Sequence, residues 1–178
     1  DEVRQQQNET KWKELDLHWL HGDHMGVIGT GAIGSEIARM AHCFGMTVTG
    51  CARTKRKHDL FEKVYSIENL HKFLEEPTYV VLSLPLTAKT RGLIGMKELE
   101  IMGSESYLIN IARGPIVKEN ELITALRNSI IKGAILDVFE QEPLPPDSPL
   151  WEMDNVFVAP HHSGPSVPNE ITDRKSVV

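Results

Sequence analysis

The chain has 178 residues, of which 40% are hydrophobic and 25% are charged, and its formal net charge is −6. This ordinary globular composition excludes a disordered chain, a collagen-like repeat and a coiled coil, and the length suits one domain. The acidic balance argues against a general nucleic-acid-binding surface. No apolar run approaches the roughly 20 residues of a membrane span, and no signal-peptide pattern opens the chain. Cys43 and Cys51 form no C-x-x-C motif, so we expect free thiols and a cytoplasmic protein.

The first 21 residues are polar and rich in glutamine. Within them, Trp12, Leu15 and Trp19 recur at the spacing of one helix face, which predicts a helix whose apolar stripe needs a partner surface. Three parts are expected on this basis: a helical arm over 1–21, a folded domain over 22–164 and a polar tail over 165–178.

Short, almost wholly apolar runs alternate with helical patterns from Gly26 onward. Such runs are typical of parallel strands that are covered by helices on both faces. We therefore predict an α/β Rossmann-type fold, a doubly wound parallel sheet of about six strands in a three-layer αβα arrangement. The predicted strands are 26–30, 46–51, 79–84, 107–111, 134–138 and 156–159, and the predicted helices are 32–44, 66–74 and 118–130.

The first predicted helix of the domain, residues 32–44, has its own expected core face. Gly45 suits its C-terminal end. Cys43 and Cys51 are expected to be small buried hydrophobic residues. The residues expected to face the core are Ile33, Ile37, Met40, Ala41 and Phe44.

A G-x-G-x-x-G motif lies between the first predicted strand and this helix. Gly29 permits the tight turn, Gly31 lets the backbone approach a pyrophosphate, and Gly34 lets helix and strand pack closely. The N-terminus of the helix then offers N–H groups and partial positive charge to the anion. The motif predicts dinucleotide binding, whereas the simpler interpretation is a glycine-rich turn kept for packing.

The end of the second predicted strand bears on which dinucleotide binds. NAD enzymes usually carry an acidic residue there for the ribose 2′-hydroxyl, but this chain has Ala52. A planar guanidinium and nearby ammonium groups suit a 2′-phosphate, so the pattern favours NADP over NAD, against the alternative of a solvated charged loop. The residues that follow Ala52 are Arg53, Thr54, Lys55, Arg56 and Lys57.

Three further polar segments each follow a predicted strand, at the edge where ligands bind to open α/β sheets. Asn110-Ile-Ala-Arg-Gly follows the fourth strand, Asp137-Val-Phe-Glu-Gln-Glu-Pro the fifth and Pro160-His-His-Ser-Gly the sixth. Together they bring an arginine, carboxylates and a histidine from separate loops. Arg113 lies before Gly114-Pro115, which favours a functional over a surface role.

These ordered motifs, GxGxxG, NxARG, LDVFxxEP and PHxxG, resemble those of the D-isomer-specific 2-hydroxyacid dehydrogenases over residues 22–164. Among the branches of that family, the chain is most similar to the glyoxylate/hydroxypyruvate reductases and the phosphoglycerate-dehydrogenase-like enzymes. The resemblance implies an oxidoreductase that transfers hydride between NAD(P)H and a small 2-keto or 2-hydroxy acid.

The resemblance also assigns roles to four residues. Arg113 would bind the substrate carboxylate, His161 would be the general acid, Glu142 would pair with His161, and Asp137 would reach the nicotinamide end of the cofactor. From the residues alone, Glu140 competes with Glu142 and Asp137 could be a strand-end residue. His161 and its neighbour His162 point to opposite sides in an extended chain, and the motif selects His161.

The remaining expectations concern the cofactor walls. Four residues that follow the third and fourth predicted strands would line the nicotinamide and adenine-ribose parts of the cofactor site: Leu84, Pro85, Ile111 and Ala112. No metal site is expected, because Gly22 would break the helix needed to gather His18, His21 and His24. The full set of expected cofactor contacts is Gly29, Gly31, Ala32, Ile33, Gly34, Arg53, Thr54, Lys55, Arg56, Leu84, Pro85, Ile111, Ala112, Arg113, Asp137, His161 and Gly164.

The resemblance covers the cofactor domain of the family but not its substrate domain. We therefore expect these 178 residues to bind cofactor, to turn over little substrate alone, and to form a homodimer through this domain. The alternatives are a dinucleotide-sensing corepressor-like module, which keeps the same catalytic residues, and a formate dehydrogenase. The latter is disfavoured because that branch replaces the glutamate partner of the histidine with glutamine, while Glu142 is present.

Overall fold

A computed structural model describes residues 2–15, 18–54 and 57–164 of the chain. Lys55, Arg56 and the predicted tail lie outside this described part. Its strands are β1 His24–Ile28, β2 Thr47–Ala52, β3 Lys63–Ser66, β4 Tyr79–Leu82, β5 Tyr107–Asn110, β6 Gly133–Leu136 and β7 Val156–Val158. Its helices are α1 Glu2–Asn8, α2 Ala32–Cys43, α3 Leu70–Leu74, α4 Met96–Met102 and α5 Glu119–Arg127, with 3₁₀ turns η1 Ile67–Asn69, η2 Gly114–Ile116 and η3 Pro149–Trp151.

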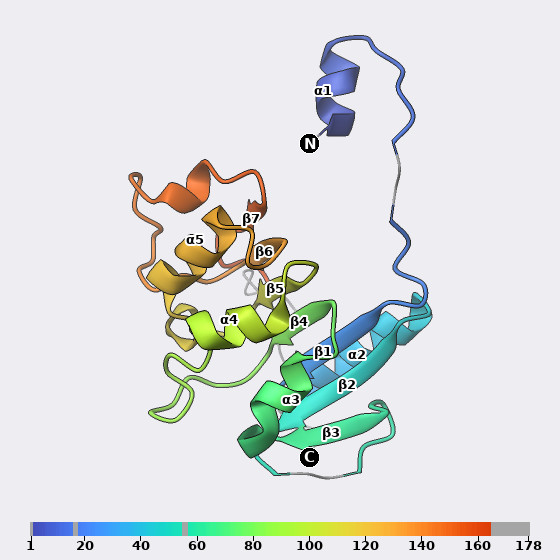
Figure 1. The fold of residues 1–178 in the computed structure, drawn as a ribbon, viewed down its shortest axis with the longest axis vertical. Helices are drawn as coiled ribbons and strands as arrows, with labels where there is room; N and C mark the ends of the chain where they lie inside the picture. Colours follow the sequence, from blue (N-terminus) through green and yellow to red (C-terminus); the bar gives the residue numbers. More distant parts are fainter. Residues whose placement is uncertain (1, 16–17, 55–56, 165–178) are drawn as a thin grey trace, which may run out of the picture.

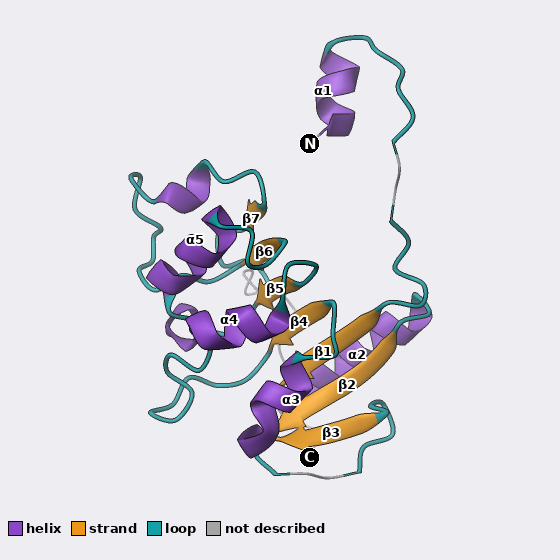
Figure 2. Ribbon diagram, in the orientation of Figure 1, coloured by secondary structure: helices purple, strands orange, loops and turns teal. Residues whose placement is uncertain are grey.

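The seven described strands form one parallel sheet in the order β3-β2-β1-β4-β5-β6-β7. Helices α3, α4 and α5 lie on one face, and α2 lies on the other, over β1 and β2 (Figures 1 and 2). The predicted α/β, three-layer Rossmann-type fold is confirmed. The strand order reverses between β1 and β4, and open α/β sheets bind ligands at the carboxyl ends of the strands beside such a reversal.

The structure adds a strand and a helix that the sequence pattern did not predict. Strand β3 is four residues long, has a polar residue at each end and forms one edge of the sheet, so it lacks the apolar run used to find the other strands. Helix α4 buries only Leu99 and Met102 and carries three charged residues in seven, which weakens its helical pattern. The helix predicted over 66–74 corresponds to η1 and α3, and that predicted over 118–130 ends at Arg127.

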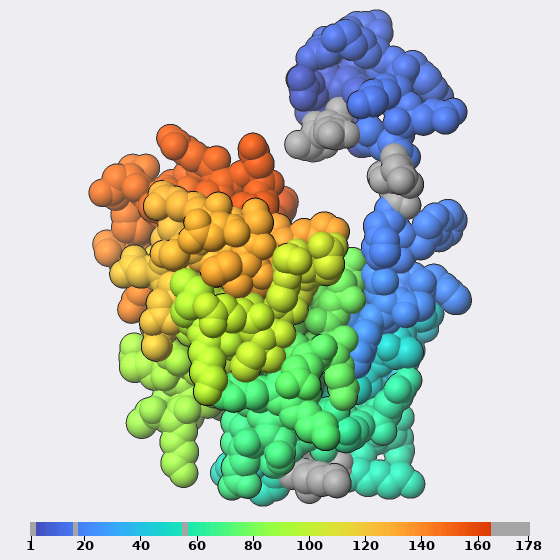
Figure 3. Space-filling view, in the orientation of Figure 1, coloured from blue at the N-terminus to red at the C-terminus, as the bar shows by residue number. Residues whose placement is uncertain are grey.

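The predicted helical arm over 1–21 is wrong for most of its described length. Helix α1 ends at Asn8, and residues 11–15 and 18–20 have no regular structure. Trp12 and Trp19 are 97% and 80% exposed, so they do not form a stripe packed on the domain. The space-filling view shows α1 standing apart from the body (Figure 3). A spacing rule finds a helix only where packing stabilises it, and this arm packs on nothing in the described chain.

The core face predicted for α2 is confirmed at Ala41, which is buried, and at Ile37, which is partly buried against the core, but it is wrong at three positions. The buried residues are Gly34, Ala38 and Ala41, whereas Ile33, Met40 and Phe44 are exposed. Small side chains let the helix approach β1 closely, so the large apolar residues lie to the side. The expected burial of the two cysteines holds for Cys51 and fails for Cys43, which is exposed at the end of the same helix.

The α2 face of the sheet is covered at one end and open at the other. One row of neighbouring side chains crosses it, in the order Val27, Val81, Ile109, Ile135 and Phe157. Val27 and Val81 are buried under α2, whereas Ile135 and Phe157 are 40% and 64% exposed. The opposite face of β5 and β6 is buried under α4 and α5. The described chain therefore leaves part of an apolar sheet face uncovered.

None of the helices in the described part of the chain has the length and apolar character needed to cross a bilayer.

Candidate cofactor and active site

The glycine-rich turn connects β1 to α2 beside the reversal of the strand order. Gly29 has a φ of +105°, and its N–H donates to the Cys51 carbonyl at 2.8 Å, which ties the turn to β2. A Cβ on Gly34 would lie 1.9 Å from the Gly29 carbonyl oxygen, whereas a Cβ on Gly31 would meet nothing within 4 Å. Gly34 is thus required for packing, while Gly31 faces open space at the N-terminus of α2, where an anion can approach.

Ser83 is a residue of this turn that sequence reasoning missed. It follows β4 directly, and its hydroxyl donates to the Gly29 carbonyl at 2.8 Å. The turn is therefore held from β2 on one side and from the end of β4 on the other. A serine after an apolar strand carries no pattern of its own, and only the strand order places it beside the turn.

The residues after β2 lie beside this turn. Arg53 and Thr54 are exposed, as are Ala32 and Ile33 in the first turn of α2. Leu84 and Pro85 follow β4, and Leu84 is half-buried whereas Pro85 is exposed. These positions surround the carboxyl ends of β1, β2 and β4, as the sequence predicted, and Gly164 lies exposed at the end of the described chain.

Asn110 organises the loop that carries Arg113. Its side chain is buried, its Oδ1 accepts the Ala112 N–H at 3.1 Å and its Nδ2 donates to the Arg113 carbonyl at 3.2 Å. A Cβ on Gly114 would lie 1.9 Å from the Phe139 backbone, so this glycine lets the loop pack against the loop after β6. Sequence reasoning quoted Asn110 as part of a motif without giving it a role. Its burial at the end of a strand is what identifies it as a clamp.

Arg113 lies at the surface of this loop. Its side chain is exposed, and its Nη1 donates to the Ala112 carbonyl at 2.6 Å. The predicted neighbours Ile111 and Ala112 are half-buried and buried on the same loop. Arg113 is close enough to Glu142 for its charge to help lower the pKa of that carboxyl group.

Glu142 and His161 meet at the carboxyl end of β6. The carboxylate Oε2 lies 2.7 Å from Nδ1 of the imidazole, and Oε1 accepts the Phe139 N–H at 3.0 Å. Burial raises the pKa of Glu142, but the hydrogen bonds from His161 and Phe139 and the charges of His161 and Arg113 outweigh it, so the pKa is below its usual value. Glu142 is therefore an ionised partner that fixes the ring, leaving Nε2 for proton transfer.

The competing acid, Glu140, lies elsewhere. Its side chain is exposed, and its N–H donates to the Glu119 carboxylate at the start of α5 at 3.0 Å. Between the two acids that the residues alone left open, the structure brings only Glu142 to His161.

Asp137 is buried and holds the loop that carries the histidine. Its two carboxylate oxygens accept the N–H groups of His162 and Ser163 at 2.7 and 3.0 Å. Burial raises the pKa of Asp137, but the hydrogen bonds from Ser163 and His162 and the charge of His161 lower it by more. The pKa is therefore below its usual value, and the carboxyl group is ionised at neutral pH. Both oxygens are engaged with this loop, so the clearest role that the structure gives Asp137 is to anchor His161.

The N-terminal histidines have separate partners. His18 pairs with Asp23 at 2.8 Å, and His24 hydrogen-bonds to Thr49 at 2.9 Å. The described residues contain no group of three or more His, Cys, Asp or Glu side chains placed to hold a metal ion.

The chain is similar to proteins of one known family. Residues 1–163 match the family model described as "D-isomer specific 2-hydroxyacid dehydrogenase, NAD binding domain". The chain is similar to the structure of a family protein from Aeromonas salmonicida, with 39% identity and a TM-score of 0.88 over 93% of this chain and 54% of that one.

Two further similar structures are of proteins that use or bind NADPH. One is the NADPH-dependent glyoxylate/hydroxypyruvate reductase of Sinorhizobium meliloti, with 30% identity, a TM-score of 0.86 and coverage of 93% of this chain and 66% of that one. The other is a D-isomer specific 2-hydroxyacid dehydrogenase from Xanthobacter autotrophicus in complex with NADPH, with 39% identity, a TM-score of 0.85 and coverage of 94% and 69%. The chain thus spans a little over half to about two thirds of the proteins it resembles.

Proposed function

The chain belongs to the D-isomer specific 2-hydroxyacid dehydrogenase family, and on that premise we propose that it supplies the cofactor site and catalytic groups for reduction of a small 2-keto acid, such as glyoxylate or hydroxypyruvate, by NADPH. The observation that carries the proposal is the Glu142–His161 pair. The pair joins the loops after β6 and β7, with Arg113 nearby on the loop after β5, at the same carboxyl edge of the sheet as the dinucleotide turn after β1.

The glycine-rich turn fits a bound dinucleotide. Gly31 leaves open space at the N-terminus of α2, and Gly29 and Ser83 fix the turn that presents it. The pyrophosphate would sit on Gly31 and the first turn of α2. When bound, the nicotinamide supplies the hydride, which no side chain can donate.

The protein groups then act on the keto acid. Arg113 binds its carboxylate with a planar pair of N–H groups. His161 gives a proton from Nε2 to the keto oxygen of the substrate as the keto carbon gains a hydride, which yields the 2-hydroxy acid. Glu142 keeps the ring oriented through Nδ1 and stabilises its protonated form.

NADP preference rests on Arg53 and its basic neighbours at the end of β2, in place of an acidic residue. Saturating NADPH should raise the melting temperature by several degrees, and NADH by clearly less. Arg53→Asp should remove most of the NADPH effect and leave that of NADH, whereas Arg91→Asp, an exposed arginine far along the chain, should change neither. Equal stabilisation by both cofactors, unchanged in Arg53→Asp, would refute the phosphate site.

Catalysis is tested with protein and NADPH at equal concentrations, so that a single turnover can be seen. This is needed because these residues span only 54% of the Aeromonas protein, and we propose that they turn over little substrate alone. Slow NADPH oxidation on glyoxylate should disappear in His161→Asn, while NADPH binding is retained. Rapid multiple turnover by the chain would contradict the proposal that these residues alone turn over little substrate. NADPH binding with no oxidation, even in a single turnover, would favour a sensing module.

The partner that we propose for this chain is a second copy of itself. The uncovered apolar sheet face around Ile135 and Phe157, together with an arm whose Trp12 and Trp19 pack on nothing in the described chain, favours a homodimer in which a second copy covers this face. Light scattering should give a dimer mass for the wild type and a monomer for Phe157→Asp. A wild-type monomer would contradict the dimer.

A further inference from the structure

The loop between β2 and β3 is fastened to α2 by a histidine that no sequence motif marks. His58 Nε2 lies 3.2 Å from the hydroxyl of Ser35, in the first turn of α2. The Leu60 N–H donates to His58 Nδ1 at 3.3 Å. Because Nδ1 accepts, the ring proton is on Nε2, which therefore donates to Ser35.

A second histidine fastens the same loop. His42 Nε2 lies 3.1 Å from the Leu60 carbonyl. His42 is seven residues after Ser35, so both lie on one face of α2, two turns apart. Helix α2 thus holds the loop at two points along its length.

Packing holds this end of the loop still. Phe61 is buried, and its ring meets His58 edge to face, with centroids 4.9 Å apart. A Cβ on Gly50 would lie 3.0 Å from the Phe61 ring, so the phenylalanine lies directly on β2. The Glu62 N–H donates to the Val48 carbonyl at 2.9 Å, which returns the chain to the sheet.

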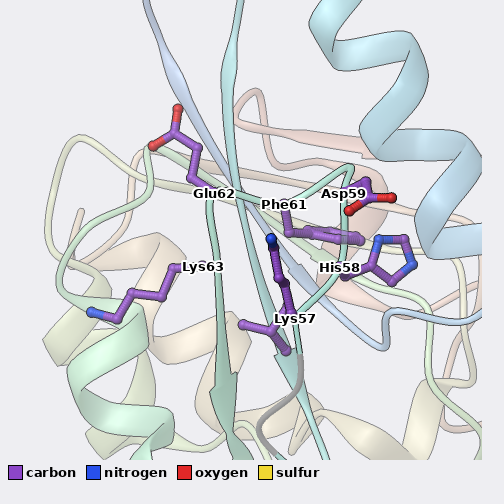
Figure 4. Close-up of a pocket in the computed structure, with 7 residues that line it drawn as sticks. Lys57, His58, Asp59, Phe61, Glu62 and Lys63 are labelled. Carbon is purple, nitrogen blue, oxygen red and sulfur yellow. The ribbon is translucent and has the colours of Figure 1, made fainter.

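The other end of the loop carries the basic residues. Arg53 continues directly from β2, and Lys57 precedes His58. Lys57 and His58 line a hollow of about 640 Å³, in which Asp59 and Glu62 also take part (Figure 4). Lys63 lines the hollow as well, so its two lysines and two acids balance in charge and it offers a phosphate no net attraction.

Distance makes the His58–Ser35 bond relevant to cofactor choice. In a dinucleotide, the 2′-position lies at a fixed distance from the pyrophosphate, and the first turn of α2 fixes the pyrophosphate. Cations that read a 2′-phosphate must therefore keep a fixed distance from that turn. The His58–Ser35 hydrogen bond is a direct link between the turn and the basic segment.

We propose that His58, anchored on Ser35, is a positioning residue that sets the preference for NADPH over NADH by holding the described basic residues Arg53 and Lys57 beside the first turn of α2. This inference rests on the NADPH preference proposed above. His58 acts through the loop and does not itself contact the phosphate, because its two ring nitrogens are engaged with Ser35 and Leu60.

The test measures dissociation constants for NADPH and NADH separately, with melting temperatures as a check on folding. His58→Phe keeps the ring packed near Phe61 and loses both hydrogen bonds, and Ser35→Ala removes the anchor at a helical position where alanine is favourable. Each should weaken NADPH binding by about five- to tenfold, the effect of a lost hydrogen bond, and NADH binding by less than about twofold. His58→Gln, whose amide can still donate to Ser35, should restore NADPH affinity.

The controls separate a structural role from a specificity role. His71→Phe changes an exposed histidine on α3 that pairs with Glu98 and should leave both affinities unchanged. Equal losses for NADPH and NADH, or no rescue by His58→Gln, would overturn the inference. If the wild type prefers NADPH and both His58→Phe and Ser35→Ala keep that preference, the role of His58 is overturned and the NADPH preference stands. If the wild type binds NADPH and NADH equally well, the proposed NADPH preference is overturned as well.

Discussion

The phosphate-binding half and the catalytic half of the sheet hold their working groups by different means. Around β1, β2 and α2, backbone approaches backbone, and Gly34 is needed because a side chain would strike the Gly29 carbonyl. Around β5 and β6, the buried side chains of Asn110 and Asp137 accept or donate hydrogen bonds to loop backbone. The first arrangement leaves a glycine motif in the sequence, whereas the second has one close-packed glycine, Gly114, and motifs defined mainly by polar residues.

The largest effect should come from filling the close approach in the phosphate-binding half. Gly34→Ala puts a methyl group against the Gly29 carbonyl, and we expect a loss of about 3 kcal/mol in the free energy of unfolding. Gly31→Ala is the matched control, because its Cβ meets open space and should leave stability unchanged while weakening NADPH binding. Urea unfolding and NADPH titration measure the two effects. Equal stability losses in both variants would break the assignment of one glycine to packing and the other to ligand.

A smaller effect should follow from removing the anchor in the catalytic half. Asp137→Ala leaves the N–H groups of His162 and Ser163 without their acceptor, and we expect a loss of about 2 kcal/mol at pH 7. Because its pKa is lowered from 3.8 in the fold, the stabilising contribution of Asp137 is present above that value and is lost as the pH falls below it. Urea unfolding at pH 7 and at pH 3 should show the difference between wild type and variant shrinking. A difference that is constant with pH would mean that the charge of Asp137 does not matter.

The partly exposed Glu142–His161 pair should contribute less. Glu142 also has a lowered pKa, from 4.5, so its contribution is present above that value and declines as the pH falls through the folded-state value. Solvent screens the pair, and Glu142→Gln should cost less than about 1 kcal/mol at pH 6. The same variant should still lose most of any NADPH oxidation, so a large stability loss would show that the pair is mainly structural.

The two thiols offer the mildest probe, which leaves the fold intact. Burial raises the pKa of Cys51 in β2 to about 12, whereas Cys43 is exposed at the end of α2. In native protein near pH 8, one thiol should react quickly with an aromatic disulfide, and Cys43→Ser should abolish that fast phase. NADPH should slow the remaining reaction of Cys51, because a bound ligand suppresses opening of the phosphate-binding half. Fast labelling of both thiols would contradict this expectation.

Sequence reasoning identified most of the fold, because buried parallel strands are apolar runs. It failed where packing decided the outcome. Three large apolar residues predicted for the core face of α2, Ile33, Met40 and Phe44, are exposed, since Gly34 and Ala38 allow the helix to sit closer to the sheet than a large side chain would. The spacing of Trp12 and Trp19 predicted a helix that has no surface to pack against in the described chain.

The candidate site divides in the same way. Motif order placed Arg113, Glu142 and His161 on adjacent loops, and the structure brings Glu142 and His161 into contact. The anchoring residues were missed, because the roles of Ser83 and His58 depend on partners 54 and 23 positions away along the chain. Only the folded arrangement of strands brings those partners together.

His161, the proposed proton donor, follows β7, which has three residues and one neighbouring strand, at the edge of the sheet. Edge strands open locally at a lower free energy than the whole domain unfolds. Fraying of β7 would withdraw His161 from Glu142 and the loop from Asp137 while the phosphate-binding turn stays folded. Proton-transfer competence is therefore expected to disappear on warming before dinucleotide binding does, and amide exchange should be faster at Val158 than at Val27.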